Sequence, residues 1–475
     1  MEKVYENCGL CVAHSLHDIY SFIKSLQHRG REAAGIAFIG DKKIDVIKWV
    51  GKVDMFGLED LYKIFPITNY HTFLAHVRYA TKGRKDKILE DAHPHVIGGI
   101  KEDRGSHVII RDCDLVAVHN GQVNSDFLEC VDKSKLSTGC DTEALLHYFK
   151  DNSERGIIKN IPGAYTLAIA SKDRKEVIVL RDKAGIKPGV LGWKDGKHCV
   201  SSEDCFFREK GVLFKEDIEP GYVYYFSPEG DYRKEKVVDK KLKHCFFEYN
   251  YVANVDSMIN GVSVRRVREL LGEQLAEEFR FYADFVTFLP RCPEVAARSF
   301  SKKTGIPFIH VFYKPKDERA FLGSTIEERK NSITNNLYLM PEIDGKETKE
   351  ILRGKTIILI DDSTIRGNNS KRAIEILKQA GVGKIYLINY TPKIGIIGND
   401  GQKRGCLYGV DMPPEDNFIV RNELENKNQE DYIINEQIGA EVKFLSVEGM
   451  LKAFEKAGLA RENLCYFCIG GEKPF

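Results

Sequence analysis

The sequence lacks an excess of either charge, because 71 lysines and arginines face 70 aspartates and glutamates. It therefore offers no basic surface of the kind that binds nucleic acid or anionic lipid. Apolar runs long enough to span a bilayer are also absent. The first residues, MEKVYENCGL, lack the basic and apolar regions of a signal peptide. We expect a cytoplasmic protein with no nucleic-acid partner and no membrane partner.

Internal repeats and low-complexity segments are missing as well, and the remaining composition is that of an ordinary globular protein. A chain of 475 residues predicts about two to four domains. The 12 cysteines are then expected to be thiols, nucleophiles or metal ligands. A disulfide framework is not expected in a reducing compartment.

An apolar, β-rich run at residues 356–360 is followed by two acids, Asp361 and Asp362. Small polar residues come next, and then a helical pattern over residues 370–380. This order predicts a buried strand of a parallel sheet with a ligand site at its carboxyl end. A helix start and a donor-rich turn attract phosphate, whereas the two acids suit sugar hydroxyls or a metal ion. The residues alone leave open a plain strand, acidic turn and helix cap.

Residues 358–370 resemble the phosphoribosyl-pyrophosphate (PRPP) loop of the type I phosphoribosyltransferases. The resemblance implies that the two acids hold the ribose hydroxyls and that the following turn surrounds the 5′-phosphate. The PRPP-binding residues expected from this loop are Asp361, Asp362, Ser363, Thr364, Arg366, Gly367, Asn368, Asn369 and Ser370.

The first half of the chain is dominated by short strand patterns. A helix is predicted between Cys8 and residue 26, and another over residues 144–150. The pair Asn120-Gly121 follows a predicted strand and is a strong turn signal. Strands are expected at residues 73–81, 115–119, 165–170, 177–180 and 222–226.

An ordered set of motifs in this half resembles the class II glutamine amidotransferases. The matching motifs are Cys8-Gly9, His28-Arg29-Gly30, the run from His76 to Thr81, His119-Asn120-Gly121 and Asp141-Thr142-Glu143. The resemblance implies an α+β N-terminal-nucleophile glutaminase domain with αββα layers.

The residue types fit the chemistry of glutamine, which carries a carboxylate and an ammonium. Arg78 can make a forked pair with the carboxylate, and Asp141 can hold the ammonium. The resemblance adds Thr81 to the glutamine-binding residues. In this family the N-terminal cysteine, here Cys8, attacks the side-chain amide and its own α-amine acts as base. Asn120 and the backbone N–H of Gly121 match the oxyanion hole.

The α-amine of Cys8 exists only if Cys8 is the first residue, yet residues 1–7 precede it. The resemblance therefore implies a propeptide that is cut between Asn7 and Cys8. The expected domains are the propeptide (1–7), the glutaminase domain (8–235), the phosphoribosyltransferase domain (236–435) and a C-terminal segment with cluster cysteines (436–475).

The second half alternates helix and strand patterns, which predicts an α/β domain with a parallel sheet. Helices are expected at residues 264–281 and 294–303, and strands at 285–289 and 385–390. A glutaminase followed by a PRPP domain resembles the amidophosphoribosyltransferase family over nearly the full chain. The resemblance implies that ammonia from glutamine is transferred to C1 of PRPP, which gives 5-phosphoribosylamine in the first step of purine synthesis. It also implies Mg²⁺ with PRPP, purine nucleotides as inhibitors and a homo-oligomer.

Cys465 and Cys468 form a C-x-x-C pair near the C-terminus, and Cys245 and Cys406 lie far away in sequence. Each stands where one subgroup of the family carries a ligand of a [4Fe–4S] cluster. The resemblance therefore implies such a cluster, since these clusters commonly take four thiolates. Zinc stays open as the alternative metal.

The transferase half departs from the family at the pyrophosphate side. Residues 290–292 read Pro-Arg-Cys where the family has Pro-Asp-Ser, and residues 314–317 and 333–337 also lose the usual motifs. We expect Arg291 to supply a cation that positions 334 and 336 no longer supply, and Cys292 to lie with Asp361 and Asp362 in the magnesium region. A second hypothesis is a diverged paralogue with glutaminase activity and a regulatory, ligand-binding transferase-like domain.

Overall fold

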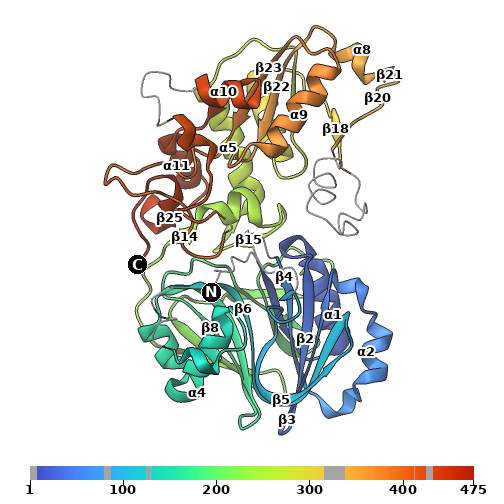
Figure 1. Cartoon of the computed structure of the whole chain (residues 1–475), viewed down its shortest axis with the longest axis vertical. Coiled ribbons are helices and arrows are strands. Elements are labelled where there is room, and N and C mark those ends of the chain that lie inside the picture. The colour runs from blue at the N-terminus through green and yellow to red at the C-terminus, as the bar shows by residue number, and fades with distance from the viewer. Residues whose placement is uncertain are drawn as a thin grey trace.

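The computed structural model describes residues 8–79, 87–124, 127, 131–314, 337–410, 412–423 and 432–475. The described chain forms two lobes, with the N-terminal half in one and the C-terminal half in the other (Figure 1). No helix among the described residues is long and apolar enough to cross a membrane. The described cysteines form no disulfide.

The N-terminal lobe is built on 13 hydrogen-bonded strands in the order β11-β9-β10-β1-β4-β2-β3-β6-β7-β8-β12-β13, with β5 paired to β6. The strands are β1 (Gly9–Ala13), β2 (Ala33–Gly40), β3 (Lys43–Val50), β4 (Thr72–Arg78), β5 (His95–Asp103), β6 (His107–Val123), β7 (Gly163–Ser171), β8 (Val177–Arg181), β9 (Val190–Lys194), β10 (Lys197–Ser201), β11 (Leu213–Asp217), β12 (Tyr222–Phe226) and β13 (Tyr232–Lys236).

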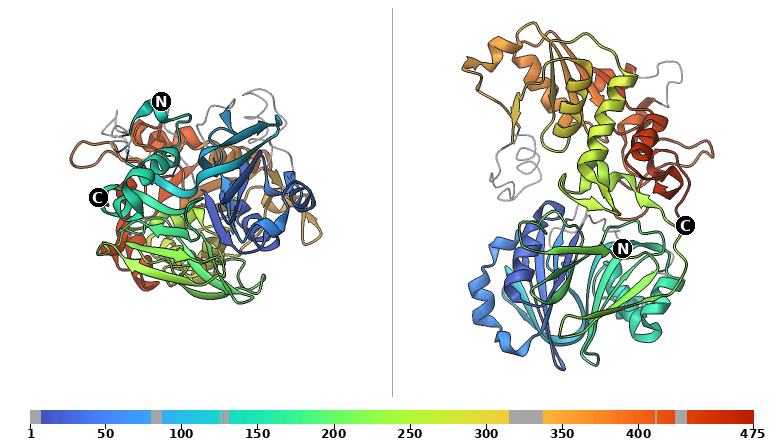
Figure 2. Two further views of the ribbon diagram at one scale, coloured as in Figure 1. Left: turned by 90° about the horizontal axis from the view of Figure 1, so that it is seen from below. Right: turned by 180° about the vertical axis from the view of Figure 1, so that it is seen from behind.

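Three apolar cores separate four layers in this lobe. One core lies under α1 (Leu16–Ser25) and α2 (Leu58–Ile64), and another lies under α4 (Asp141–Asn160). The third lies between the two halves of the strand array and contains residues of both, such as Leu10 and Ala168. Figure 2 shows the helices on the outer faces of the strands. The predicted αββα arrangement is therefore confirmed. The helices are needed because each half of the strand array must bury its outer face as well as its inner face.

The helix predicted between Cys8 and residue 26 is present as α1, but it begins only at Leu16, where the Ser15 hydroxyl accepts the Asp18 N–H at 3.1 Å, and the residues directly after Cys8 form β1. The turn predicted at Asn120-Gly121 is wrong, because the pair lies inside β6 and is paired with β7. Gly121 has φ +145°, and a Cβ there would lie 1.8 Å from the Ala164 carbonyl oxygen. Close strand packing, and not a chain reversal, requires this glycine.

The C-terminal lobe contains the predicted parallel sheet, in the order β17 (Phe285–Phe288), β22 (Thr356–Asp361), β23 (Lys384–Asn389) and β24 (Glu441–Phe444). The helices of this lobe are α5 (Val264–Glu278), α6 (Glu294–Thr304), α8 (Thr348–Leu352), α9 (Asn368–Gln379), α10 (Tyr432–Ile438) and α11 (Val447–Lys456). Short hairpins complete it: β15 (Met258–Ile259) with β16 (Val262–Ser263), β18 (Phe312–Tyr313) with β19 (Tyr338–Leu339), and β20 (Glu342–Ile343) with β21 (Lys346–Glu347).

The end of the chain returns to the boundary between the lobes. There β25 (Leu464–Cys465) pairs in parallel with β14 (His244–Cys245), so that Cys245 lies opposite Cys465. The π-helical turn η6 (Glu248–Val252) follows β14 and lies at the same boundary.

A buried ion network joins the lobes. Arg29, in the turn η1 (Gln27–Arg29), donates to Glu203 at 2.5 Å and to Glu248 at 3.1 Å. The Lys187 ammonium lies 3.0 Å from the second Glu248 oxygen. All four side chains are at most 1% exposed. Burial is costly for each charge alone, so the network holds only while both lobes supply their members.

Replacing Glu248 by glutamine should lower the free energy of unfolding by about 3 kcal/mol, because two buried cations lose their shared counter-charge. Denaturant titration checks this. Glu235→Gln is the matched control, since Glu235 pairs at 2.7 Å with the half-exposed Arg155 and its loss should cost less than about 1 kcal/mol. Equal effects of the two variants would contradict the assignment.

Candidate functional site

Cys8 is fully buried at the start of β1, and its carbonyl oxygen accepts the Arg29 Nε–H at 2.7 Å. The Ser202 hydroxyl lies between this strand and the predicted oxyanion hole. It accepts the Leu10 N–H at 3.0 Å and the Asn120 Nδ2–H at 3.5 Å. The fold therefore brings Cys8, Asn120 and Gly121 to one region from β1 and β6.

Arg78 ends β4, and Asp141 begins α4. Arg78 closes β4, is 1% exposed, and its Nη2 lies 3.6 Å from the Asp91 carboxylate. Asp141 opens α4 and accepts the Val123 N–H at 2.8 Å. The turn before β2 packs on the Arg78 backbone so closely that a Cβ at Gly30 would lie 2.5 Å from its carbonyl carbon. Thr81 lies outside the described residues.

Four buried histidines lie close together near the start of α4, and the motif analysis did not find them as a group. The rings of His76 and His93 stack with centroids 4.0 Å apart, and His95 meets His93 edge-on at 4.6 Å. His119 Nδ1 lies 3.5 Å from an Asp141 oxygen. Burial lowers the pKa of His76 to about 3, and it also lowers the pKa of His93 and His95. These rings are therefore neutral. The short spacing His93-Pro94-His95 was the available signal.

The predicted acid pair ends β22 at the carboxyl edge of the sheet. Asp361 is 4% exposed and accepts the Ser370 hydroxyl at 3.3 Å, and Asp362 accepts the Ser363 hydroxyl at 2.8 Å. Burial and the charge of Asp362 raise the pKa of Asp361 well above its usual range. Burial is also the main cause that raises the pKa of Asp362 to about 6. The charge of Asp362 thus disfavours the ionisation of Asp361.

The rest of the PRPP loop leads into α9. Gly367 caps the helix at φ +78°, and the exposed Asn368 and Asn369 form its first residues. The Thr364 hydroxyl donates to Asn389 at 2.8 Å and so fixes the loop to β23. Arg366 pairs with Asp416.

Arg291 and Lys314 belong to two other segments, and the charges of the acid pair act on Lys314. Arg291 is exposed, and its Nη2 lies 3.5 Å from the Lys314 carbonyl oxygen. Burial lowers the pKa of Lys314, while the charge of Asp361 raises it. Burial raises the pKa of the Cys292 thiol to about 11. The Arg268 charge lowers this pKa, and the charges of Asp362 and Asp361 raise it. Residues 315–336 lie outside the described part of the chain. They include positions 316, 317 and 333–336 of the departing motifs.

Arg268, on α5, was missed by the sequence reasoning. Its guanidinium is 2% exposed, donates to the Tyr249 and Ala253 carbonyl oxygens at 2.9 and 2.8 Å, and lowers the pKa of Asp362. A single arginine in an amphipathic helix gives no local signal, because most such arginines are solvated.

The four predicted cluster cysteines meet around one small cavity. Cys245, Cys406, Cys465 and Cys468 line it together with apolar side chains such as Ile186 and Phe246. The Cys406 sulfur accepts the N–H groups of Tyr408 and Val410 at 3.4 and 3.3 Å. Burial raises the pKa of the Cys465 thiol to about 12. Three distant segments thus converge on one thiol-lined site.

Known proteins match the chain over most of its length. Residues 95–209 match a glutamine amidotransferase domain family. An amidophosphoribosyltransferase of Methanocaldococcus jannaschii is 30% identical over an alignment 492 positions long, which covers 96% of this chain and 94% of that protein. The chain belongs to the amidophosphoribosyltransferase family. The family predicted from the motifs is therefore confirmed, and the chain is an enzyme with this activity.

Solved amidophosphoribosyltransferase structures agree with this membership. A glutamine PRPP amidotransferase from Bacillus subtilis, complexed with ADP and GMP, is 25% identical with a TM-score of 0.78, and 98% of this chain and 97% of that chain are covered. The structure of an allosteric regulatory enzyme of purine biosynthesis gives a TM-score of 0.79 at 25% identity, over 98% of this chain and 96% of that chain. The predicted order of a glutaminase and a transferase domain is confirmed, and no comparison favours the diverged-paralogue hypothesis.

The raised pKa of Asp362 predicts an unusual pH dependence. An acid whose folded pKa lies at about 6, against 3.8 ordinarily, destabilises the fold as pH rises through this interval. Asp362→Asn should therefore raise the melting temperature of protein free of divalent cations at about pH 7 and leave it unchanged at about pH 4. Calorimetric scans at both pH values check this.

Asp284→Asn is the control with the opposite sign. The Asp284 carboxylate accepts the Thr356 N–H and pairs with Lys355, and both interactions lower its pKa. Its loss should lower the melting temperature at neutral pH. A lower melting temperature for Asp362→Asn at neutral pH would refute the strain assigned to the acid pair.

Proposed function

We propose that this chain hydrolyses glutamine at Cys8 and transfers the ammonia to C1 of PRPP. The products are glutamate, pyrophosphate and 5-phosphoribosylamine, as in the first step of purine synthesis. The observation that carries the proposal is that one chain joins the buried Cys8, at the Arg78 end of the β1–β4 pair, to an acid pair at a strand end, through the buried network of Arg29, Glu203, Glu248 and Lys187.

In the glutaminase half, Arg78 pairs with the carboxylate of the substrate glutamine, and Asp141 holds its ammonium group. Thr81 is a further glutamine-binding residue. The Cys8 thiolate attacks the side-chain carbonyl carbon, and its α-amine takes the thiol proton once residues 1–7 are removed. Asn120 Nδ2 makes one long hydrogen bond of 3.5 Å, which leaves its second N–H for the oxyanion beside the Gly121 N–H. The C–N bond then breaks, ammonia leaves, and water hydrolyses the thioester.

In the transferase half, Asp361 and Asp362 accept the ribose hydroxyls, and the loop from Ser363 to Ser370 donates to the 5′-phosphate. Ammonia forms a bond to C1 while the bond from C1 to the pyrophosphate oxygen breaks. Arg291 and Lys314 supply positive charge on the pyrophosphate side. The acid pair, with Cys292 in the same region, fits Mg²⁺, because a cation would favour the ionised form of two carboxyl groups whose pKa values are raised by burial. The ion would neutralise charge on the leaving pyrophosphate.

The four-cysteine site fits a [4Fe–4S] cluster better than one zinc ion. Tetrahedral zinc needs its sulfur ligands about 3.8 Å apart, given bonds of about 2.3 Å. Among the described residues, no three of these four sulfur atoms all lie within 4.8 Å of one another. A cube of irons binds each thiolate through a different iron and takes ligands further apart. The N–H groups on the Cys406 sulfur favour a thiolate there.

Further parts of the proposal concern regulation and assembly. The Bacillus subtilis relative was solved with ADP and GMP, and we extend purine-nucleotide binding to this chain. We also propose a homo-oligomer and the domain bounds 1–7, 8–235, 236–435 and 436–475.

Cys8→Ala should lower glutamine-dependent phosphoribosylamine formation by at least about a thousandfold, because the nucleophile is lost. Pyrophosphate release with ammonium salts should persist. Coupled assays of glutamate and pyrophosphate check both, and intact mass should show active wild-type chains beginning at Cys8.

Cys11→Ala is the matched control. It removes a buried thiol of the same strand, whose sulfur contacts the Ser201 hydroxyl at 3.7 Å, and should keep both activities. Glutamine-dependent turnover by Cys8→Ala, or activity of chains that still carry residues 1–7, would defeat the assignment of Cys8 as N-terminal nucleophile.

Protein purified without air should be brown and contain about four irons and four sulfides per chain. Cys406→Ser should lose the colour, because one thiolate is removed, whereas Cys199→Ser, a buried thiol of β10, should keep it. Metal analysis and absorption spectra decide between the metals. Colourless wild-type protein with zinc bound by four sulfurs would support the zinc alternative.

A further inference from the structure

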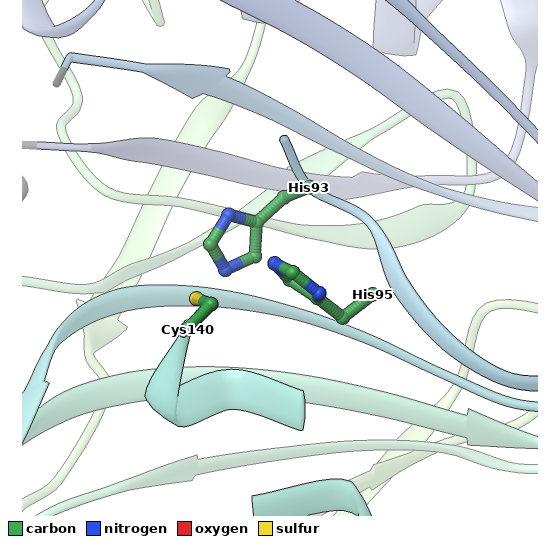
Figure 3. A group of neighbouring side chains, drawn as sticks. All are labelled: His93, His95 and Cys140. Carbon is green, nitrogen blue, oxygen red and sulfur yellow. The ribbon is translucent and has the colours of Figure 1, made fainter. Parts of the chain in front are cut away.

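A second group of potential metal ligands lies inside the glutaminase lobe. Its residues are distant in sequence from those of the four-cysteine cavity. One ligand atom each from His93, His95 and Cys140 lies within 4.8 Å of the others. The three residues are only 1, 3 and 4% exposed. Figure 3 shows the Cys140 sulfur at the start of α4 facing the two imidazole rings, which come from a separate segment. Two sequence regions thus present nitrogen and sulfur donors to one buried position.

Neighbouring polar groups hold these rings in place. His93 Nε2 lies 2.9 Å from the Thr142 hydroxyl, and His95 Nε2 lies 3.3 Å from the Asp91 carbonyl oxygen. The segment before His93 is fixed in turn, because the Lys48 ammonium donates to the Glu90 and Ala92 carbonyl oxygens at 3.2 and 2.8 Å. Polar contacts of this kind orient histidine ligands in metal proteins.

The donor set selects the class of ion. Two imidazoles and a thiol, with no carboxylate, suit zinc and related transition metals and do not suit magnesium or calcium. In a tetrahedral zinc site the ligand atoms are about 3.3 to 3.8 Å apart, given bonds of about 2.0 and 2.3 Å. The present separations of at most 4.8 Å therefore require only a small contraction. A water molecule can take the fourth position.

We propose that His93, His95 and Cys140 bind one Zn²⁺ ion. The ion ties the start of α4 to the segment that precedes β5. Cys140 directly precedes Asp141, and His95 contacts the backbone of Asp91, whose carboxylate lies 3.6 Å from Arg78. Metal binding would thus fix both predicted glutamine-holding side chains, a consequence that rests on the proposed function, whereas metal binding itself does not.

Zinc content measured by mass spectrometry tests the proposal on the full chain purified without chelators. Wild-type protein should hold about one zinc more than Cys140→Ser and more than His95→Gln. Cys113→Ser is the matched control, because Cys113 is a buried thiol of β6 in the same lobe and its removal should leave the zinc content unchanged. Equal zinc in all four proteins, or none in the wild type, overturns the proposal.

X-ray absorption at the zinc edge tests the proposal on wild-type protein, so the result does not depend on whether a variant folds. A shell of one sulfur with two or three nitrogen or oxygen neighbours supports the site, and a shell of four sulfurs overturns it by placing the zinc among Cys245, Cys406, Cys465 and Cys468. Cobalt-loaded wild type should also show thiolate-to-cobalt absorption that Cys140→Ser lacks. Zinc in this shell without glutaminase activity would defeat only the proposed function, and activity without zinc would defeat only the metal site.

Discussion

The arrangement of both lobes depends on a small set of buried charges at their boundary. Arg29 and Lys187 come from the glutaminase lobe and meet Glu248 of the transferase lobe, while Glu203 balances the second positive charge. The Glu203 carboxylate also accepts the Asn254 N–H at 2.8 Å and the Ser257 hydroxyl at 2.5 Å, both from the transferase lobe. With water excluded, each ion depends on the others, so the two lobes have one favourable relative placement.

This network connects the two proposed reaction centres through contiguous contacts. Arg29 holds the Cys8 carbonyl oxygen, and Glu248 begins the turn η6. Later in that turn, Asn250 donates to the Thr391 hydroxyl at 2.9 Å, and the Thr391 N–H donates to the Asp362 carbonyl oxygen at 3.1 Å. A shift of either site therefore strains the same turn. The path is a structural connection, and energetic coupling along it would need the two sites to bias one shared element.

The sequence predicted the parts whose residues are local and missed those that meet only in the fold. Asp361 and Asp362 directly follow an apolar strand, and the strand-then-acid order was sufficient to find them. The pair Asn120-Gly121 led to the wrong prediction of a turn. The glycine is there because the Ala164 carbonyl of the neighbouring strand leaves no room for a side chain. Glu203 has its partner 174 positions away at Arg29, and no periodicity encodes such a distance. The four cluster cysteines were found only through the family resemblance, since one C-x-x-C supplies two ligands.

The departures at the pyrophosphate side become understandable from the charge around the acid pair. Asp361 is buried and Asp362 is half-buried next to it, and burial raises the pKa of both carboxyl groups, so two negative charges are disfavoured there. Arg268 offers some compensation, because its charge lowers the pKa of Asp362, while two of its five N–H groups donate to backbone carbonyls. A site held in this state gains most from a ligand that arrives with its own cation, as a magnesium-bound pyrophosphate does. In the proposed function, positive charge at Arg291 and Lys314 serves the phosphate groups, and an acid at position 291 would add a third negative charge to a site that already disfavours two.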